Sequence, residues 1–158
     1  MSRDRKIGAY VKIACDTLHD VKTLGPTRRS SANLLFQAIE NIVLCVLEIE
    51  NENIDKSKRY KVRHHNLDAF IDLLPDECVL KTRLKTLEVV ASYATTYRYP
   101  TDGGRIPQSP TIEELKTWEN TANEIIQEII YHCDIDINNH KPVARIINPI
   151  RDDSGPSV

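Results

Sequence analysis

The sequence lacks the local signatures of several large enzyme families. It contains no His-Glu-x-x-His zinc motif, no Cys-x-x-Cys pair, no nucleophile elbow and no glycine-rich loop between a strand and a helix. Gly103 and Gly104 are adjacent, but no strand precedes them and no helix follows at once, so a plain turn is favoured over a phosphate loop. We therefore expect neither a metal nor a cofactor.

Cysteine usage points to a reducing compartment. The four cysteines are spread along the chain without metal-ligand spacing, at Cys15, Cys45, Cys78 and Cys133. Together with the lack of a recognisable signal peptide, this spacing favours reduced and mostly buried thiols over disulfides. We expect a cytoplasmic protein.

Long apolar runs and a strong charge of either sign are also missing. No apolar run reaches the roughly 18 residues of a membrane span, because Glu40 and Asn41 interrupt the best candidate. We therefore expect no membrane contact. The net charge of −2 gives no general attraction to nucleic acid, so any such contact has to come from a local patch.

Apolar residues recur at three- and four-residue spacing, which predicts an all-α protein. A chain of 158 residues fits one domain with a single core. The expected helices cover residues 5–24, 28–51, 66–74, 79–97 and 110–133, and they form an up-and-down, four-helix-bundle-like arrangement of about five helices. This bundle is expected to span residues 1–140, with an exposed charged loop at 51–61 and an extended or disordered tail at 141–158.

Capping residues mark the ends of two of these helices. Asn66 can cap the short third helix, and Pro75 stops it. The last helix begins either with Ser109 as its cap or with a capping box formed by Thr111 and Glu114. Its expected core stripe consists of Ile112, Leu115, Trp118, Ala122, Ile125, Ile129 and Cys133.

The second expected helix is apolar around most of its circumference, so it should lie centrally and contact several neighbours. A narrow polar stripe interrupts it at helical spacing, formed by Gln37, Glu40, Asn41 and Glu48. This stripe has three interpretations: solvent exposure, an internal hydrogen bond to a neighbouring helix, or contact with a ligand.

Positive charge is concentrated in the segment "RYKVRHHNLD", before the third helix. Its basic residues are Arg59, Lys61, Arg63, His64 and His65. Such a patch could position a phosphate, and a histidine within it could move a proton near neutral pH. The alternative is a solvated loop in which Asn66 or a histidine caps the helix.

The segment "TTYRYP" ends the fourth expected helix with a cation between two tyrosines. Arg98 could pair with a phosphate, while Tyr97 and Tyr99 could stack on a base. Equally, Tyr97 could belong to the core, and Arg98 could pair with a carboxylate such as Glu40.

Three of these segments, in this order, resemble motifs of the HEPN family (higher eukaryotes and prokaryotes nucleotide-binding domains). The second helix is similar at Phe36, Gln37, Ala38 and Glu40, although Leu44 replaces a lysine that is frequent in the family. "HHNLDAFIDLLP" resembles the family's third helix at His65, Leu67 and Leu74, and "YRYP" resembles the Arg-Tyr-Pro that ends its fourth. The similarity covers residues 6–133.

The resemblance implies an up-and-down helical bundle that is usually dimeric and is often encoded with a minimal nucleotidyltransferase. Many members are toxins that cleave RNA without a metal, using an arginine that is followed closely by a histidine. The arginine would hold the scissile phosphate and the imidazole would transfer a proton. Here Arg59 is followed by His64 and His65, whereas no histidine follows Arg98 before His132.

Two departures from the family weaken the catalytic reading. Tyr60 stands where the family commonly has a small polar residue, and the Arg59 segment precedes the third helix, earlier than in catalytic members. We therefore expect a homodimeric, non-catalytic module that binds a nucleotide or RNA, or partners a nucleotidyltransferase. Its expected ligand site comprises Gln37, Glu40, His65, Tyr97, Arg98 and Tyr99. The alternatives are a metal-independent endoribonuclease with catalytic Arg59, His64 and His65, and a purely structural interaction module.

Overall fold

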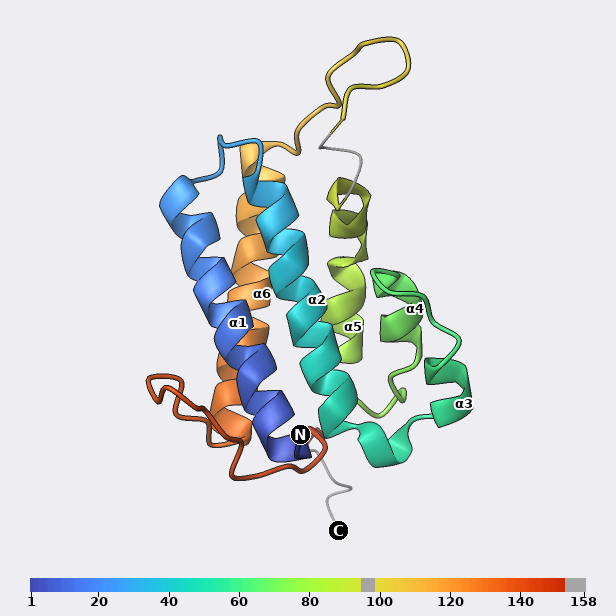
Figure 1. Cartoon of the computed structure of the whole chain (residues 1–158), viewed down its shortest axis with the longest axis vertical. Helices are drawn as coiled ribbons and strands as arrows, with labels where there is room; N and C mark the ends of the chain where they lie inside the picture. Colours follow the sequence, from blue (N-terminus) through green and yellow to red (C-terminus); the bar gives the residue numbers. More distant parts are fainter. Residues whose placement is uncertain (95–98, 153–158) are drawn as a thin grey trace.

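The computed structural model describes residues 1–94 and 99–152, which form an all-α bundle as the periodicity predicts (Figure 1). Helix α2 (Ser31–Ile49) lies at the centre, beside the long helices α1 (Arg3–Leu24) and α6 (Ile112–His132). Shorter helices lie on its other side, where α4 (Leu67–Asp72) and the 3₁₀ helix η2 (Glu88–Tyr93) contact it and α5 (Lys81–Thr86) precedes η2. The 3₁₀ helix η1 (Asn51–Asn53) and α3 (Lys56–Arg59) follow the C-terminal end of α2. No strand occurs among the described residues.

Burial explains the apolar composition of α2. Thirteen of its 19 residues are buried, because neighbouring helices contact it on several sides. By length and composition this helix could also cross a membrane, although Glu40 and Asn41 interrupt it, so the expectation that no segment reaches the length of a membrane span is wrong. However, 67% of the apolar window is buried inside the bundle, and a central core helix requires that composition.

The short third helix of the sequence is confirmed as α4. The Asn66 side chain accepts a hydrogen bond from the Ala69 amide at 3.5 Å, and the helix buries Leu67, Phe70 and Ile71 against α2. The loop predicted at 51–61 is instead largely helical. Asp55 caps α3 by accepting from the amides of Ser57 and Lys58, so local capping builds a helix where apolar periodicity is absent.

The single helix predicted at 79–97 is interrupted within its described part. Helix α5 ends at Thr86, and the 3₁₀ helix η2 follows from Glu88. The buried residues Leu84, Leu87 and Val90 are spaced by three, which matches the three residues per turn of a 3₁₀ helix. This spacing keeps one apolar edge on the core through the change of helix type.

Helix α6 begins with the capping box rather than with Ser109. The Thr111 hydroxyl oxygen accepts from the Glu114 amide at 3.1 Å, and the Glu114 carboxylate accepts from the Thr111 amide at 2.8 Å. The expected core stripe is buried from Leu115 to Cys133, apart from the half-buried Trp118. Ile112 is 48% exposed, because it occupies the first turn beyond the end of the core.

Residues 141–152, called the strap here, contain no helix and pack across the ends of α1, α2 and α6 (Figure 1). The Ala144 amide donates to the Asp4 carbonyl, and the Arg145 amide donates to the Cys133 carbonyl. Arg151 forms a two-pronged ion pair with Glu50, whose side chain is only 1% exposed. The rest of the expected tail, residues 153–158, lies outside the described residues.

The strap makes Gly8 sensitive to substitution. A Cβ atom added at this position would lie 2.1 Å from the Pro142 carbonyl oxygen, so the strap or α1 would have to move. We expect Gly8→Ala to lower the free energy of unfolding by about 1–3 kcal/mol, measured by urea denaturation. Gly103→Ala is the matched control, since nothing lies within 4 Å of its added Cβ. Equal urea midpoints for the two variants would contradict the close packing of the strap.

Candidate functional site

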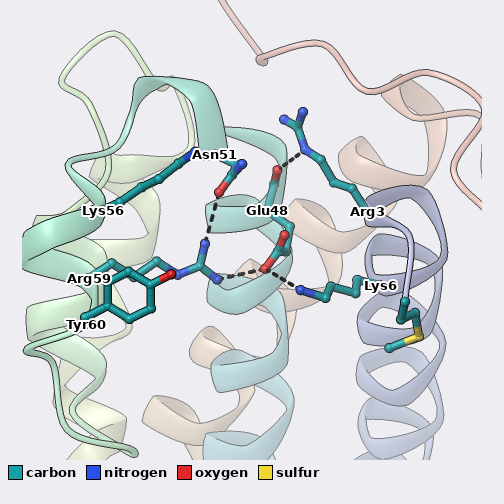
Figure 2. Close-up of a pocket in the computed structure, with 8 residues that line it drawn as sticks. Arg3, Lys6, Glu48, Asn51, Lys56, Arg59 and Tyr60 are labelled. Carbon is teal, nitrogen blue, oxygen red and sulfur yellow. Dashed lines mark hydrogen bonds and ion pairs between the residues drawn. The ribbon is translucent and has the colours of Figure 1, made fainter.

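An open pocket of about 430 Å³ lies where the N-terminal turns of α1 meet the C-terminal end of α2 (Figure 2). The short α1–α2 connection brings these two ends together, and η1 then turns the chain so that α3 forms the third wall. We call it the Glu48 pocket. Its lining residues are Met1, Arg3, Lys6, Glu48, Asn51, Lys56, Arg59 and Tyr60.

The Glu48 carboxylate is the buried centre of this pocket, with a side chain only 8% exposed. Arg59 Nη2 donates to Glu48 Oε1 at 2.8 Å, and Lys6 Nζ lies 3.8 Å from the same oxygen. Arg59 Nη1 also donates to Asn51 Oδ1 at 3.5 Å (Figure 2). A buried carboxylate needs such compensation, so Glu48 fixes the Arg59 guanidinium at the pocket wall.

The Arg3 side chain also binds the C-terminal end of α2, through main-chain carbonyl groups of that helix. Its Nε donates to the Glu48 carbonyl oxygen, and its Nη2 donates to the Ile49 carbonyl oxygen, both at 2.6 Å. The last carbonyls of a helix lack partners within the helix and carry partial negative charge. Arg3 therefore caps α2 and leaves the Glu48 carboxylate to Arg59 and Lys6.

The pocket carries surplus positive charge. Four cationic side chains and one carboxylate line it, which leaves a formal charge of +3 on a protein whose net charge is −2. These charges also act on Tyr10. Burial and the charge of Glu48 raise the pKa of its phenol, while the charge of Arg59 opposes the rise. The pocket is thus suited to an anion, and it is a local patch of the kind that nucleic-acid contact would require.

Two of the ligand residues proposed from the sequence, Glu40 of α2 and His65, contact each other outside the Glu48 pocket. His65 Nδ1 lies 2.7 Å from Glu40 Oε1, with side chains 70% and 15% exposed respectively. His65 has a φ of 67°, an uncommon left-handed backbone for a residue with a side chain. The Glu40 contact holds this turn against α2.

The remaining stripe residues bond within their own helix. Gln37 Nε2 donates to Asn33 Oδ1 at 2.8 Å, and Asn41 Nδ2 donates to the Gln37 carbonyl at the same distance. Both side chains are half-buried. Of the readings proposed for the stripe, internal hydrogen bonding therefore applies to these two residues, although the bonds lie along one helix and do not cross to a neighbour.

Tyr97 and Arg98 lie outside the described residues, and so does the proposed pairing of Arg98 with Glu40. Tyr99 is described and is 70% exposed. Among the six expected ligand residues, the described part of the chain shows one contact, between Glu40 and His65.

Arg59 and His65 are held by different carboxylates. Arg59 is bound to Glu48, whereas His65 is bound to Glu40, eight residues earlier on α2. Eight residues of α-helix span about 12 Å. His64 is exposed, and its ring centroid lies 6.4 Å from that of His65. Arg59 lines the Glu48 pocket, whereas neither histidine does.

Sequence reasoning missed Arg3, Lys6 and Lys56 as pocket residues. Lys6 and Glu48 are 42 positions apart, and the only local signal was that Arg3 and Lys6 lie three residues apart and so share a helix face. Glu48 itself was noted in the polar stripe, but its burial and its partners depend on how α1 and α3 pack against α2.

Nucleophilic and metal chemistry find little support among the described residues. No group of three or more histidine, cysteine, aspartate or glutamate side chains there is arranged to hold a metal. The four cysteines are free, as expected, and three of them are buried. Burial raises the pKa of Cys133 to about 11 and that of Cys45 well above its ordinary value, so both remain thiols near neutral pH.

Comparisons of this chain with protein-family models, with curated proteins and with solved structures gave no match. The HEPN resemblance therefore rests on sequence motifs alone. The geometry of the Glu48 pocket is the independent basis for an argument about function.

The two cations on Glu48 should contribute unequally to stability. We expect Arg59→Met to lower the free energy of unfolding by about 1–3 kcal/mol, because it leaves a buried carboxylate without its closest partner. Lys6→Met should cost less than about 1 kcal/mol, since Lys6 lies 3.8 Å from Glu48 and is 40% exposed. Urea denaturation of both variants measures the difference, and a larger loss in Lys6→Met would contradict this description of the pocket.

Proposed function

We propose that this protein is a non-catalytic module that binds a phosphate-bearing ligand, a nucleotide or RNA, in the Glu48 pocket. The observation that carries this proposal is the surplus of three positive charges around one buried carboxylate in an open pocket. Guanidinium and ammonium groups are the side chains that proteins use to bind phosphate oxygens. A pocket of about 430 Å³ is also within the range of small-molecule sites.

The protein's own contacts prepare these cations for an anion. Glu48 and Asn51 fix the guanidinium of Arg59, so little side-chain entropy is lost when a phosphate arrives. Lys56 is exposed on the same short helix and can approach the phosphate from the solvent side. Glu48 also competes with the ligand for Arg59 and Lys6, so the carboxylate that orders the Arg59 side chain lowers the affinity for the ligand.

The HEPN resemblance agrees with this proposal but adds statements of its own. It implies an up-and-down bundle, a homodimer and a nucleotidyltransferase partner. These remain part of the proposal, together with the cytoplasmic location expected from the cysteine usage. The resemblance also favours a ligand face that includes Gln37, Glu40 and His65. The Glu48 pocket is the stronger anion site, because Glu40 and His65 largely neutralise each other when the imidazole is charged.

RNA cleavage is the weaker alternative. A phosphodiester would need a cation and a proton-transfer group at the same phosphate. Arg59 and His65 are engaged by carboxylates about 12 Å apart along α2, and neither histidine lines the Glu48 pocket beside Arg59. Binding without cleavage therefore fits the geometry better.

Charge substitutions at the rim of the pocket should change affinity in opposite directions. We expect Lys56→Gln to weaken binding of adenosine 5′-monophosphate (AMP) by roughly 5-fold, the equivalent of about 1 kcal/mol for an exposed ion pair. Glu48→Gln should strengthen it, because Arg59 and Lys6 lose their internal competitor. Isothermal titration calorimetry measures both changes, and affinity should fall as salt rises.

Lys58→Gln is the matched control for this experiment. Lys58 is exposed on the same helix as Lys56 but does not line the pocket, so its loss should leave affinity nearly unchanged. A parallel incubation of the wild type with short single-stranded RNA and a chelator tests the alternative. No binding of AMP or RNA would refute the proposal, and shortened RNA would establish the ribonuclease instead.

A further inference from the structure

A large aromatic side chain stands in water at the rim of the Glu48 pocket. Tyr60 directly follows Arg59 and is 88% exposed, although it lines the pocket (Figure 2). A tyrosine ring gains free energy when its apolar faces are buried, so its exposure here leaves a flat apolar surface without a partner.

The ring is attached to the same rigid unit as two of the cations. The Tyr60 amide donates to the Lys56 carbonyl at 3.2 Å and closes α3, while Asp55 caps the other end. Arg59 is held in turn by Glu48. The position of the Tyr60 backbone is therefore set relative to the cations, and only the two side-chain torsions of the ring have to be ordered when a ligand binds.

Other exposed tyrosines of the described chain lack this combination. Tyr131 is 91% exposed on α6, but the hollow beside it is lined by two carboxylates, Glu124 and Glu128, and a single cation, Arg83. Tyr99 is 70% exposed in the loop before α6 and lines none of the described pockets. Tyr60 is thus the exposed tyrosine that adjoins a cationic pocket within the described residues.

We infer that Tyr60 stacks on the base of a nucleoside 5′-monophosphate unit whose phosphate lies among Arg59, Lys6 and Lys56. A nucleotide joins an anion and a flat ring through one sugar, and consecutive residues here present a guanidinium and a flat ring. This inference rests on the proposed function and narrows it, because inorganic phosphate or a sugar phosphate would leave Tyr60 unused. Stacking tolerates any base, so the site reads a nucleotide rather than a sequence.

Affinity for AMP compared with ribose 5-phosphate tests the inference, since the two share the phosphate and differ by the base. We expect the wild type to bind AMP roughly 10-fold more tightly, and Tyr60→Ala to lose that preference while keeping its affinity for ribose 5-phosphate. Tyr60→Phe should retain the preference because it retains the ring. Tyr131→Ala is the control for loss of an exposed tyrosine.

The outcomes separate the two proposals. If the wild type binds AMP and ribose 5-phosphate equally, or if Tyr60→Ala keeps the preference for AMP, the stacking role is wrong while phosphate binding stands. If neither ligand nor RNA binds, the proposed function fails and the stacking role fails with it. A 5′-phosphorylated single-stranded RNA added to the same series distinguishes a terminal nucleotide of RNA from a free nucleotide, and dependence on Tyr60 in either case supports the inference.

Discussion

The burial of α2 is the constraint on which the rest of the structure depends. This helix and its C-terminal cap carry three carboxylates into largely buried surroundings, and each contacts a basic side chain from another segment: Glu40 meets His65, Glu48 meets Arg59, and Glu50 meets Arg151. A charge removed from water must be compensated. These three contacts therefore fix the turn before α4, the short helix α3 and the strap on one central helix.

The Glu48 pocket follows from this arrangement. The antiparallel pairing of α1 with α2 places Arg3 and Lys6 beside the C-terminal end of α2, where carbonyl groups and Glu48 supply negative charge. Arg59 arrives from α3 to complete the compensation of Glu48. The cations that gather there exceed the carboxylate they neutralise, so a requirement of folding leaves a surface with surplus positive charge.

Sequence patterns indicated the helices well, because their signals are local. The apolar periodicity of α1, α2 and α6, the Asn66 cap and the Thr111–Glu114 capping box all act within a few residues. The pocket could not be found in this way, since its partners are far apart in the chain and a stripe of polar residues reads equally well as solvent-exposed. The Arg59 segment was recognised as basic, yet its engagement by Glu48 depends on tertiary packing.

Glu48 has two opposing effects on any anion that binds. Its carboxylate offsets part of the mutual repulsion among Arg3, Lys6, Lys56 and Arg59. With it, Arg59 is ordered before a ligand arrives, but part of the attraction is already satisfied inside the protein. A ligand that carries only a phosphate must compete with Glu48 on charge alone. In the proposed binding mode, the base of a nucleotide also stacks on Tyr60, for which Glu48 does not compete, so the proposal expects nucleotides to bind more tightly than simple anions.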